Sequence, residues 1–74
     1  MAAGRPYLHK ELARVLRANG NSPMRAQELA ESVNSAGRYE KRDGSRVRPN
    51  QVHARVSKHP KLFERTSLGI RLST

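Results

Sequence analysis

The sequence predicts a small α+β domain in which three short helices precede a C-terminal β-hairpin. Apolar residues recur at helical spacing in three separate segments, and the spacing changes to alternation near the C-terminus. Stretches rich in Asn, Gly and Pro separate these segments. A chain of 74 residues buries only about 60% of the surface that its unfolded form exposes, which allows one modest core. We therefore expect one domain over residues 1–74, with residues 1–6 flexible.

The first two helices are predicted from amphipathic stripes. The first stripe is formed by Leu8, Leu12, Val15 and Leu16. The second is formed by Ala26, Leu29, Ala30 and Val33. They predict helices over Tyr7–Ala18 and Ala26–Ser35, ended by the Asn-Gly-rich segment 19–23 and by Gly37. Arg25 stands where Ser or Thr would normally cap the second helix, but Glu28 can still bond back to the backbone.

A basic loop over 38–48 is predicted to lead into a third helix over Pro49–Lys58. The loop has no helical period, and we expect Tyr39 and Val47 to anchor it to the core. Pro49 suits the first position of a helix, and Val52 with Val56 provides a narrow apolar face.

The C-terminal hairpin is predicted over residues 62–73. Ile70 and Leu72 alternate with polar residues, and a turn-forming stretch at 66–69 separates them from Leu62 and Phe63. We expect Phe63 to point inward. The order of helix, helix, loop, helix and hairpin is that of a winged helix-turn-helix, in which the hairpin is the wing.

Composition points to a polyanionic partner. The chain carries a formal charge of +9 and a pI of about 11.4. Residues 1–37 hold five basic and three acidic side chains, whereas residues 38–74 hold ten and three, so the C-terminal half is the electropositive one. There is no cysteine, so disulfides and thiolate zinc sites are excluded. No apolar run approaches the roughly 20 residues that span a bilayer, and we expect a cytoplasmic, nucleoid-associated protein with no membrane partner.

The third helix has the composition of a recognition helix. With Val52 pointing inward, a rotation of about 100° per residue turns one set of side chains outward. That set comprises Asn50, Ala54, Ser57, Lys58 and, more obliquely, Gln51. Arg55 flanks this face. Asn and Gln pair with adenine and Arg pairs with guanine, while Ala54 is small enough to let the helix approach base edges. An ordinary solvated face is the alternative.

Further basic residues are candidates for phosphate contacts. On the loop they are Lys41, Arg42, Arg46 and Arg48. On the hairpin they are Arg65 and Arg71. Each such residue taken alone is more often solvated than in contact with a ligand, so the prediction depends on the cluster.

The sequence contains no pattern typical of catalysis or of metal binding. His9, His53 and His59 are isolated from one another and from carboxylates at ligand spacing, and we find no paired-carboxylate, Ser-His-Asp or phosphate-loop arrangement. We expect no enzymatic activity, no cofactor and no metal.

Several stretches of the sequence resemble the HARE-type winged helix. They are Pro23–Ala30, Gln51–Val56, Pro60–Phe63 and Ile70–Leu72, and the resemblance covers about residues 8–73. That family occurs beside restriction endonucleases, in chromatin proteins and in a bacterial RNA polymerase subunit. The resemblance implies a DNA-associated accessory module, often placed ahead of a nuclease or modification domain, although some members contact protein partners. Arg25 and the very basic loop depart from the family pattern, and the loop favours nucleic acid.

The sequence therefore predicts a module that binds double-stranded DNA, with the third helix in the major groove and the loop and wing on the backbone. The HARE-type resemblance implies the N-terminal recognition domain of a restriction or modification-dependent nuclease. The alternative is a protein-interaction module that uses the apolar edge of the first helix or the wing to bind a polymerase or nuclease. RNA binding is a third reading, but the scarcity of aromatic residues disfavours single-stranded RNA.

Overall fold

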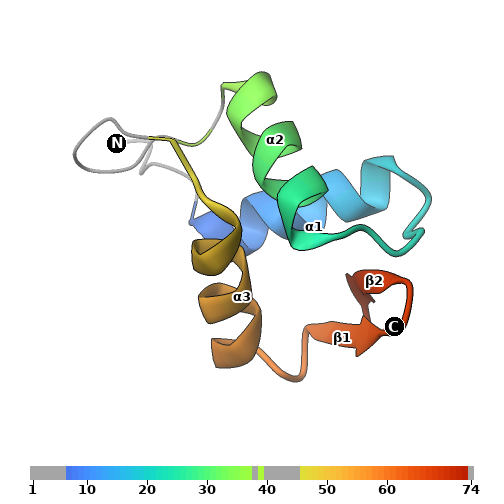
Figure 1. The fold of residues 1–74 in the computed structure, drawn as a ribbon. Coiled ribbons are helices and arrows are strands. Elements are labelled where there is room, and N and C mark those ends of the chain that lie inside the picture. The colour runs from blue at the N-terminus through green and yellow to red at the C-terminus, as the bar shows by residue number, and fades with distance from the viewer. Residues whose placement is uncertain (1–6, 38, 40–45, 74) are drawn as a thin grey trace, which may run out of the picture.

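The computed structural model describes residues 7–37, 39 and 46–73 (Figure 1). It contains α1 (Leu8–Ala18), α2 (Ala26–Ala36), α3 (Pro49–Lys58), β1 (Phe63–Thr66) and β2 (Gly69–Leu72). The two strands pair antiparallel. The predicted α+β class of three helices and a hairpin is confirmed, and the arrangement is compatible with a winged helix. Residues 1–6 and most of the expected loop, 38 and 40–45, lie outside the described residues.

The helix boundaries differ from the prediction by one residue at two ends. Tyr7 has an extended backbone, with φ −71° and ψ 149°, and its carbonyl accepts the Glu11 N–H at 3.0 Å. It is therefore the N-cap of α1 and not its first helical residue. The C-terminal end of α2 lies one residue further along the chain than predicted, at Ala36. Gly37 ends the helix with a left-handed φ of 68°.

In both α2 and α3, the side chain of the third helical residue caps the N-terminus of its own helix. The Glu28 carboxylate accepts the Arg25 N–H at 2.8 Å, as predicted. Gln51 repeats this arrangement, because its Oε1 accepts the Arg48 N–H at 2.8 Å. Each bond satisfies a backbone donor that a helix N-terminus would otherwise leave unpaired.

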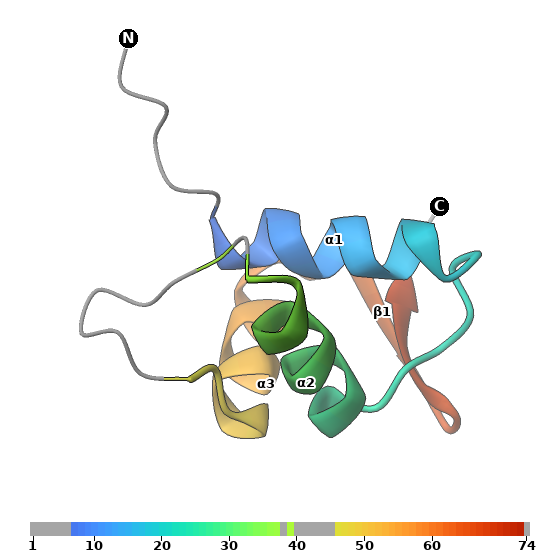
Figure 2. The same ribbon diagram turned by 90° about the horizontal axis from the view of Figure 1, so that it is seen from above.

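The core lies where the three helices and the inner face of the hairpin meet. Figures 1 and 2 show α2 and α3 on one side of α1, with the hairpin beside the C-terminal end of α1. The largest side chains that are almost completely buried are Leu12, Leu16, Leu29, Val33 and Val52. Phe63 is buried as predicted. Of the two residues expected to anchor the basic loop, Val47 is buried and Tyr39 packs against the core.

The hairpin is attached to the segment between α1 and α2. Met24 and Ile70 exchange two backbone hydrogen bonds, of 2.9 and 2.7 Å, which extends the sheet by one bridge. Next to them the Asn21 side chain accepts the Leu72 N–H at 2.7 Å and donates to the Leu72 carbonyl at 3.2 Å. Gly69 faces Met24 so closely that a Cβ would lie 2.7 Å from the Met24 carbonyl group.

A second asparagine fixes the segment that leads into α3. The Asn34 side chain donates to the Val47 carbonyl and accepts the Val47 N–H, both at 3.0 Å. Because both peptide groups of Val47 are satisfied in this way, the chain is held against α2 just before α3 begins. No helix of the described residues is long and apolar enough to cross a membrane.

Candidate functional site

An exposed stripe runs along α3 on the side opposite Val52. Val52 and Val56 are buried, and the four residues turned furthest from them are exposed. We call these four the α3 stripe: Asn50, Ala54, Ser57 and Lys58. The helical rotation predicted all four from Val52 alone. Neither α3 nor the segments next to it contain an acidic residue, because residues 44–63 include no Asp or Glu.

On one flank of α3, Arg65 ties β1 to the helix. Its Nη2 donates to the Ser57 Oγ at 2.7 Å and to the His53 carbonyl at 3.0 Å. Arg65 lies opposite Ile70 in the strand register and therefore shares the inner face of the hairpin. The residue predicted to grip DNA from the wing thus also connects the hairpin to α3.

The other flank of α3 faces α1 and is open. A small hollow of about 160 Å³ lies there, which we call the α1-side hollow. It is lined by Leu8, Tyr39, Gln51, Ala54, Arg55 and Lys58. Gln51 and Arg55 are half-buried. Gln51, which was predicted to lie obliquely on the exposed face, therefore belongs to this flank and not to the α3 stripe. Since the Gln51 oxygen already accepts the Arg48 N–H, pairing its whole amide with adenine would require this bond to break.

The structure brings some of the predicted phosphate contacts together and separates others. Arg46 and Arg48 are exposed immediately before α3, where the helix N-terminus adds partial positive charge. Arg71 is half-buried opposite Glu64, on the other face of the hairpin from Arg65. The two hairpin arginines therefore do not share a surface, because side chains of strands alternate between faces. Lys41 and Arg42 lie outside the described residues.

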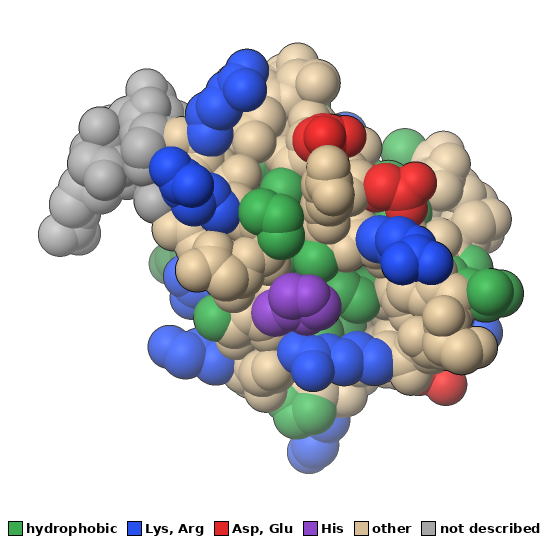
Figure 3. Space-filling model, viewed as in Figure 1, with side chains coloured by type: hydrophobic (Ala, Val, Ile, Leu, Met, Phe, Trp, Pro, Cys, Tyr) green, Lys and Arg blue, Asp and Glu red, His purple; other side chains and the backbone are tan. Residues whose placement is uncertain are grey.

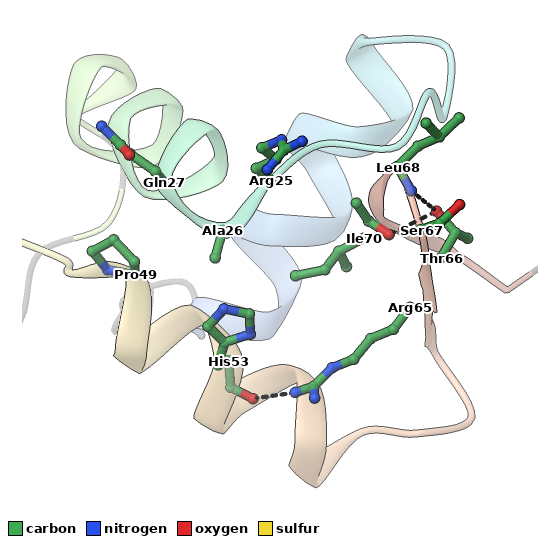
Figure 4. A pocket seen from close by; sticks show the side chains of 11 residues that line it. Arg25, Ala26, Gln27, Pro49, His53, Arg65, Thr66, Ser67, Leu68 and Ile70 are labelled. Carbon is green, nitrogen blue, oxygen red and sulfur yellow. Dashed lines mark hydrogen bonds between the residues drawn. The ribbon is translucent and has the colours of Figure 1, made fainter.

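A second, larger hollow lies between the N-terminus of α2, the flank of α3 and the hairpin. We call it the helix–hairpin hollow, and its volume is about 420 Å³. It is lined by Arg25, Ala26, Gln27, Pro49, His53, Arg65 and residues 66–70. Figure 3 shows a histidine among basic side chains on this face, and Figure 4 shows the His53 ring projecting from α3 between Ala26 and Arg65.

Sequence reasoning did not identify this hollow. It treated His53 as an isolated histidine and Arg25 only as an unusual cap. Helical spacing could have placed His53 beside the α3 stripe, because it lies four residues after Pro49 and four before Ser57. Arg25 carried no comparable signal, because its position next to α3 depends on how α2 packs.

The remaining two histidines form a ring stack at the junction of α1 and α3. His9 and His59 stack with centroids 4.1 Å apart, and Tyr7 stacks on His9 at 5.7 Å. Partial burial lowers the pKa of His9, and the nearby His59, Lys10 and Arg55 lower it further. Among the described residues, no group of three or more His, Cys, Asp or Glu side chains is placed to hold a metal ion.

No family model, curated protein or solved structure compared with this chain matches it. The HARE-type resemblance therefore remains a prediction from the residues that carry it.

Proposed function

We propose that this chain is a winged helix module that binds double-stranded DNA through the α3 stripe. The observation that supports this proposal is the α3 stripe itself. It exposes an amide, a hydroxyl, an ammonium group and a small residue on one helix face, and α3 contains no acidic residue. A major groove about 12 Å wide admits a helix, and amide and hydroxyl groups bond to base edges there. In this arrangement Asn50 reads bases, and Ala54 permits close approach.

Basic residues at both ends of α3 would contact the phosphates. Arg46 and Arg48 precede the helix, whereas Lys58 and Lys61 end it or follow it, and all four are exposed. Phosphate contacts fix the position of a protein on the duplex, while base contacts provide sequence preference. The hairpin would lie against the adjacent backbone as the wing. On the HARE-type resemblance, the module would serve as the recognition domain of a nuclease and would not itself catalyse a reaction.

A salt titration tests this proposal. Binding of a fluorescently labelled duplex is measured by anisotropy, and we expect a log–log slope of roughly −3 to −6 if about four to six phosphates are neutralised. Lys58→Ala should reduce the magnitude of that slope by about one unit. Arg17→Ala is the matched control, because Arg17 is an exposed cation on α1, away from the stripe. Absence of duplex binding even at low salt would contradict the proposal.

A protein-interaction module is the second candidate, and two exposed apolar side chains favour it. Leu68 at the hairpin turn is 72% exposed, and Tyr7 is 65% exposed. Exposed leucines are common on soluble proteins, so this observation is weaker than the α3 stripe. If duplex binding is absent while the variants remain folded, this candidate becomes the better one.

A further inference from the structure

We propose that the helix–hairpin hollow holds one phosphodiester group of the DNA backbone between Arg25, His53 and Arg65. This inference rests on the proposed function, because it assigns a specific phosphate contact beside the α3 stripe. None of the residues that line the hollow is acidic, and its volume of about 420 Å³ lies within the range of about 300–1,000 Å³ typical of ligand sites. The three groups come from the N-cap of α2, from α3 and from β1.

Arg65 supplies a cation whose position is already fixed. Both of its bonds to α3, to Ser57 and to the His53 carbonyl, use Nη2. Among the residues that the structure describes, its Nη1 and Nε have no acceptor, so their donors can bind an anion. Because the guanidinium is held before a ligand arrives, binding costs less side-chain entropy than it would for a free arginine.

Arg25 and His53 face the same hollow from α2 and α3. In Figure 4 the Arg25 side chain lies above Ala26 and the His53 ring below it, while Arg65 reaches from the hairpin toward the His53 backbone. Both side chains are exposed, and Arg25 takes part in no ion pair among the described residues. Guanidinium groups bind phosphate oxygens through charge-assisted hydrogen bonds, and an imidazole N–H adds a further donor.

The surroundings of these donors suit a phosphodiester better than an isolated ion. Pro49, Ala26 and Ile70 form an apolar part of the lining, which is complementary to the carbons of a deoxyribose. Two acidic residues lie near these donors in sequence. Glu64 precedes Arg65 but is on the other face of the hairpin, opposite Arg71, and the Glu28 carboxylate accepts the Arg25 backbone N–H at 2.8 Å. Neither carboxylate belongs to the residues that line the hollow.

Placement next to the stripe gives the hollow a role in docking. His53 and Ser57 are one helical turn apart on α3, and Arg65 contacts both. A phosphate held here would fix the distance between the DNA backbone and the stripe residues that face the bases. The hollow would therefore determine register without contributing sequence preference.

Two measurements on the whole chain test the hollow. The first is the duplex affinity of the variants Arg25→Ala and His53→Ala. Arg17→Ala is the control for Arg25→Ala, because each of these two variants loses one positive charge. We expect Arg25→Ala to weaken binding by about five- to ten-fold at 0.1 M salt and to reduce the salt slope by about one unit. His53→Ala should weaken binding less, and Arg17→Ala should leave affinity near that of the wild type.

The second measurement is an NMR titration with inorganic phosphate, which needs no DNA. Amide shifts should concentrate at Ala26, His53 and Arg65 in the wild type and disappear in Arg25→Ala. Shifts spread evenly over all basic residues, or equal weakening of duplex binding by Arg25→Ala and Arg17→Ala, would overturn the hollow and leave the proposed function intact. Localised phosphate shifts without duplex binding would overturn the proposed function and support phosphate binding by the hollow.

Discussion

The two flanks of α3 are built differently. On the hairpin flank, Arg65 crosses from β1 and forms hydrogen bonds with the helix. On the α1 flank, Gln51, Arg55 and Lys58 surround the α1-side hollow, and none of them forms a side-chain hydrogen bond to α1 within the described residues. Arg65 therefore ties the hairpin to α3 by hydrogen bonds, whereas α3 meets α1 through packed side chains. The stacked rings of His9 and His59 lie where α1 and α3 meet, so stability on this side should depend on pH.

The largest effect should come from detaching the hairpin. Gly69→Ala adds a Cβ 2.7 Å from the Met24 carbonyl group, at a φ of 142° that favours glycine. Strain and overpacking together should lower the free energy of unfolding by about 2–4 kcal/mol. In a domain of this size the thermal midpoint would fall by on the order of 10–20 °C. Thermal unfolding followed by circular dichroism provides the measurement.

Gly20→Ala is the matched control for this substitution. Gly20 also has a positive φ, of 68°, but a Cβ there would meet no atom within 4 Å. We expect it to cost only the strain of the left-handed backbone, about 1–2 kcal/mol. Equal destabilisation by the two substitutions would show that the close approach of Gly69 to Met24 adds no strain.

A smaller effect should come from the bonds between Arg65 and α3. In a double-mutant cycle, Arg65→Ala and Ser57→Ala should each destabilise the protein slightly, with a coupling energy of about 0.5–1 kcal/mol because the pair is exposed. Chemical denaturation of the four proteins measures it. A coupling near zero would mean that the bond from Arg65 to Ser57 does not hold the hairpin against α3.

The pH dependence of stability should report on the α1 flank. The pKa of His9 is lowered by partial burial and by His59, Lys10 and Arg55, so the unfolded chain binds a proton more readily than the folded one. Stability should therefore fall as the pH decreases below about 6.5, and the loss should level off below the pKa of the folded state. His9→Gln should flatten this part of the profile. Denaturation midpoints between pH 5 and pH 8 decide the matter, and an unchanged slope in the variant would contradict the assignment.

Sequence patterns predicted the elements of this fold because each pattern is local. The apolar stripe of α1, Pro49 at the start of α3 and the alternation of Ile70 with Leu72 each reflect a period that neighbouring residues reveal. The exposed stripe followed from Val52 by rotation alone. The start of α1 differs from the predicted start by one residue, because the backbone of Tyr7 is extended and not helical.

Contacts between distant segments were not predictable in this way. Asn21 marked the end of a helix in the sequence, yet its side chain pairs with Leu72, 51 residues away. Arg65 was expected at a ligand, but its bonds to α3 depend on the angle at which the hairpin packs. The helix–hairpin hollow likewise exists only after three elements have packed, so no spacing in the sequence could reveal it.

The bridge from Met24 to Ile70 also bears on self-association. The outer edge of a terminal strand offers unpaired N–H and C=O groups to which a strand of another molecule can add. On β2, the outward groups of Ile70 bond to Met24, and those of Leu72 bond to the Asn21 amide. The Asn21 side chain thus forms the two hydrogen bonds that a neighbouring strand would form with Leu72. With these four groups occupied, this edge is closed to strand addition by another copy of the chain.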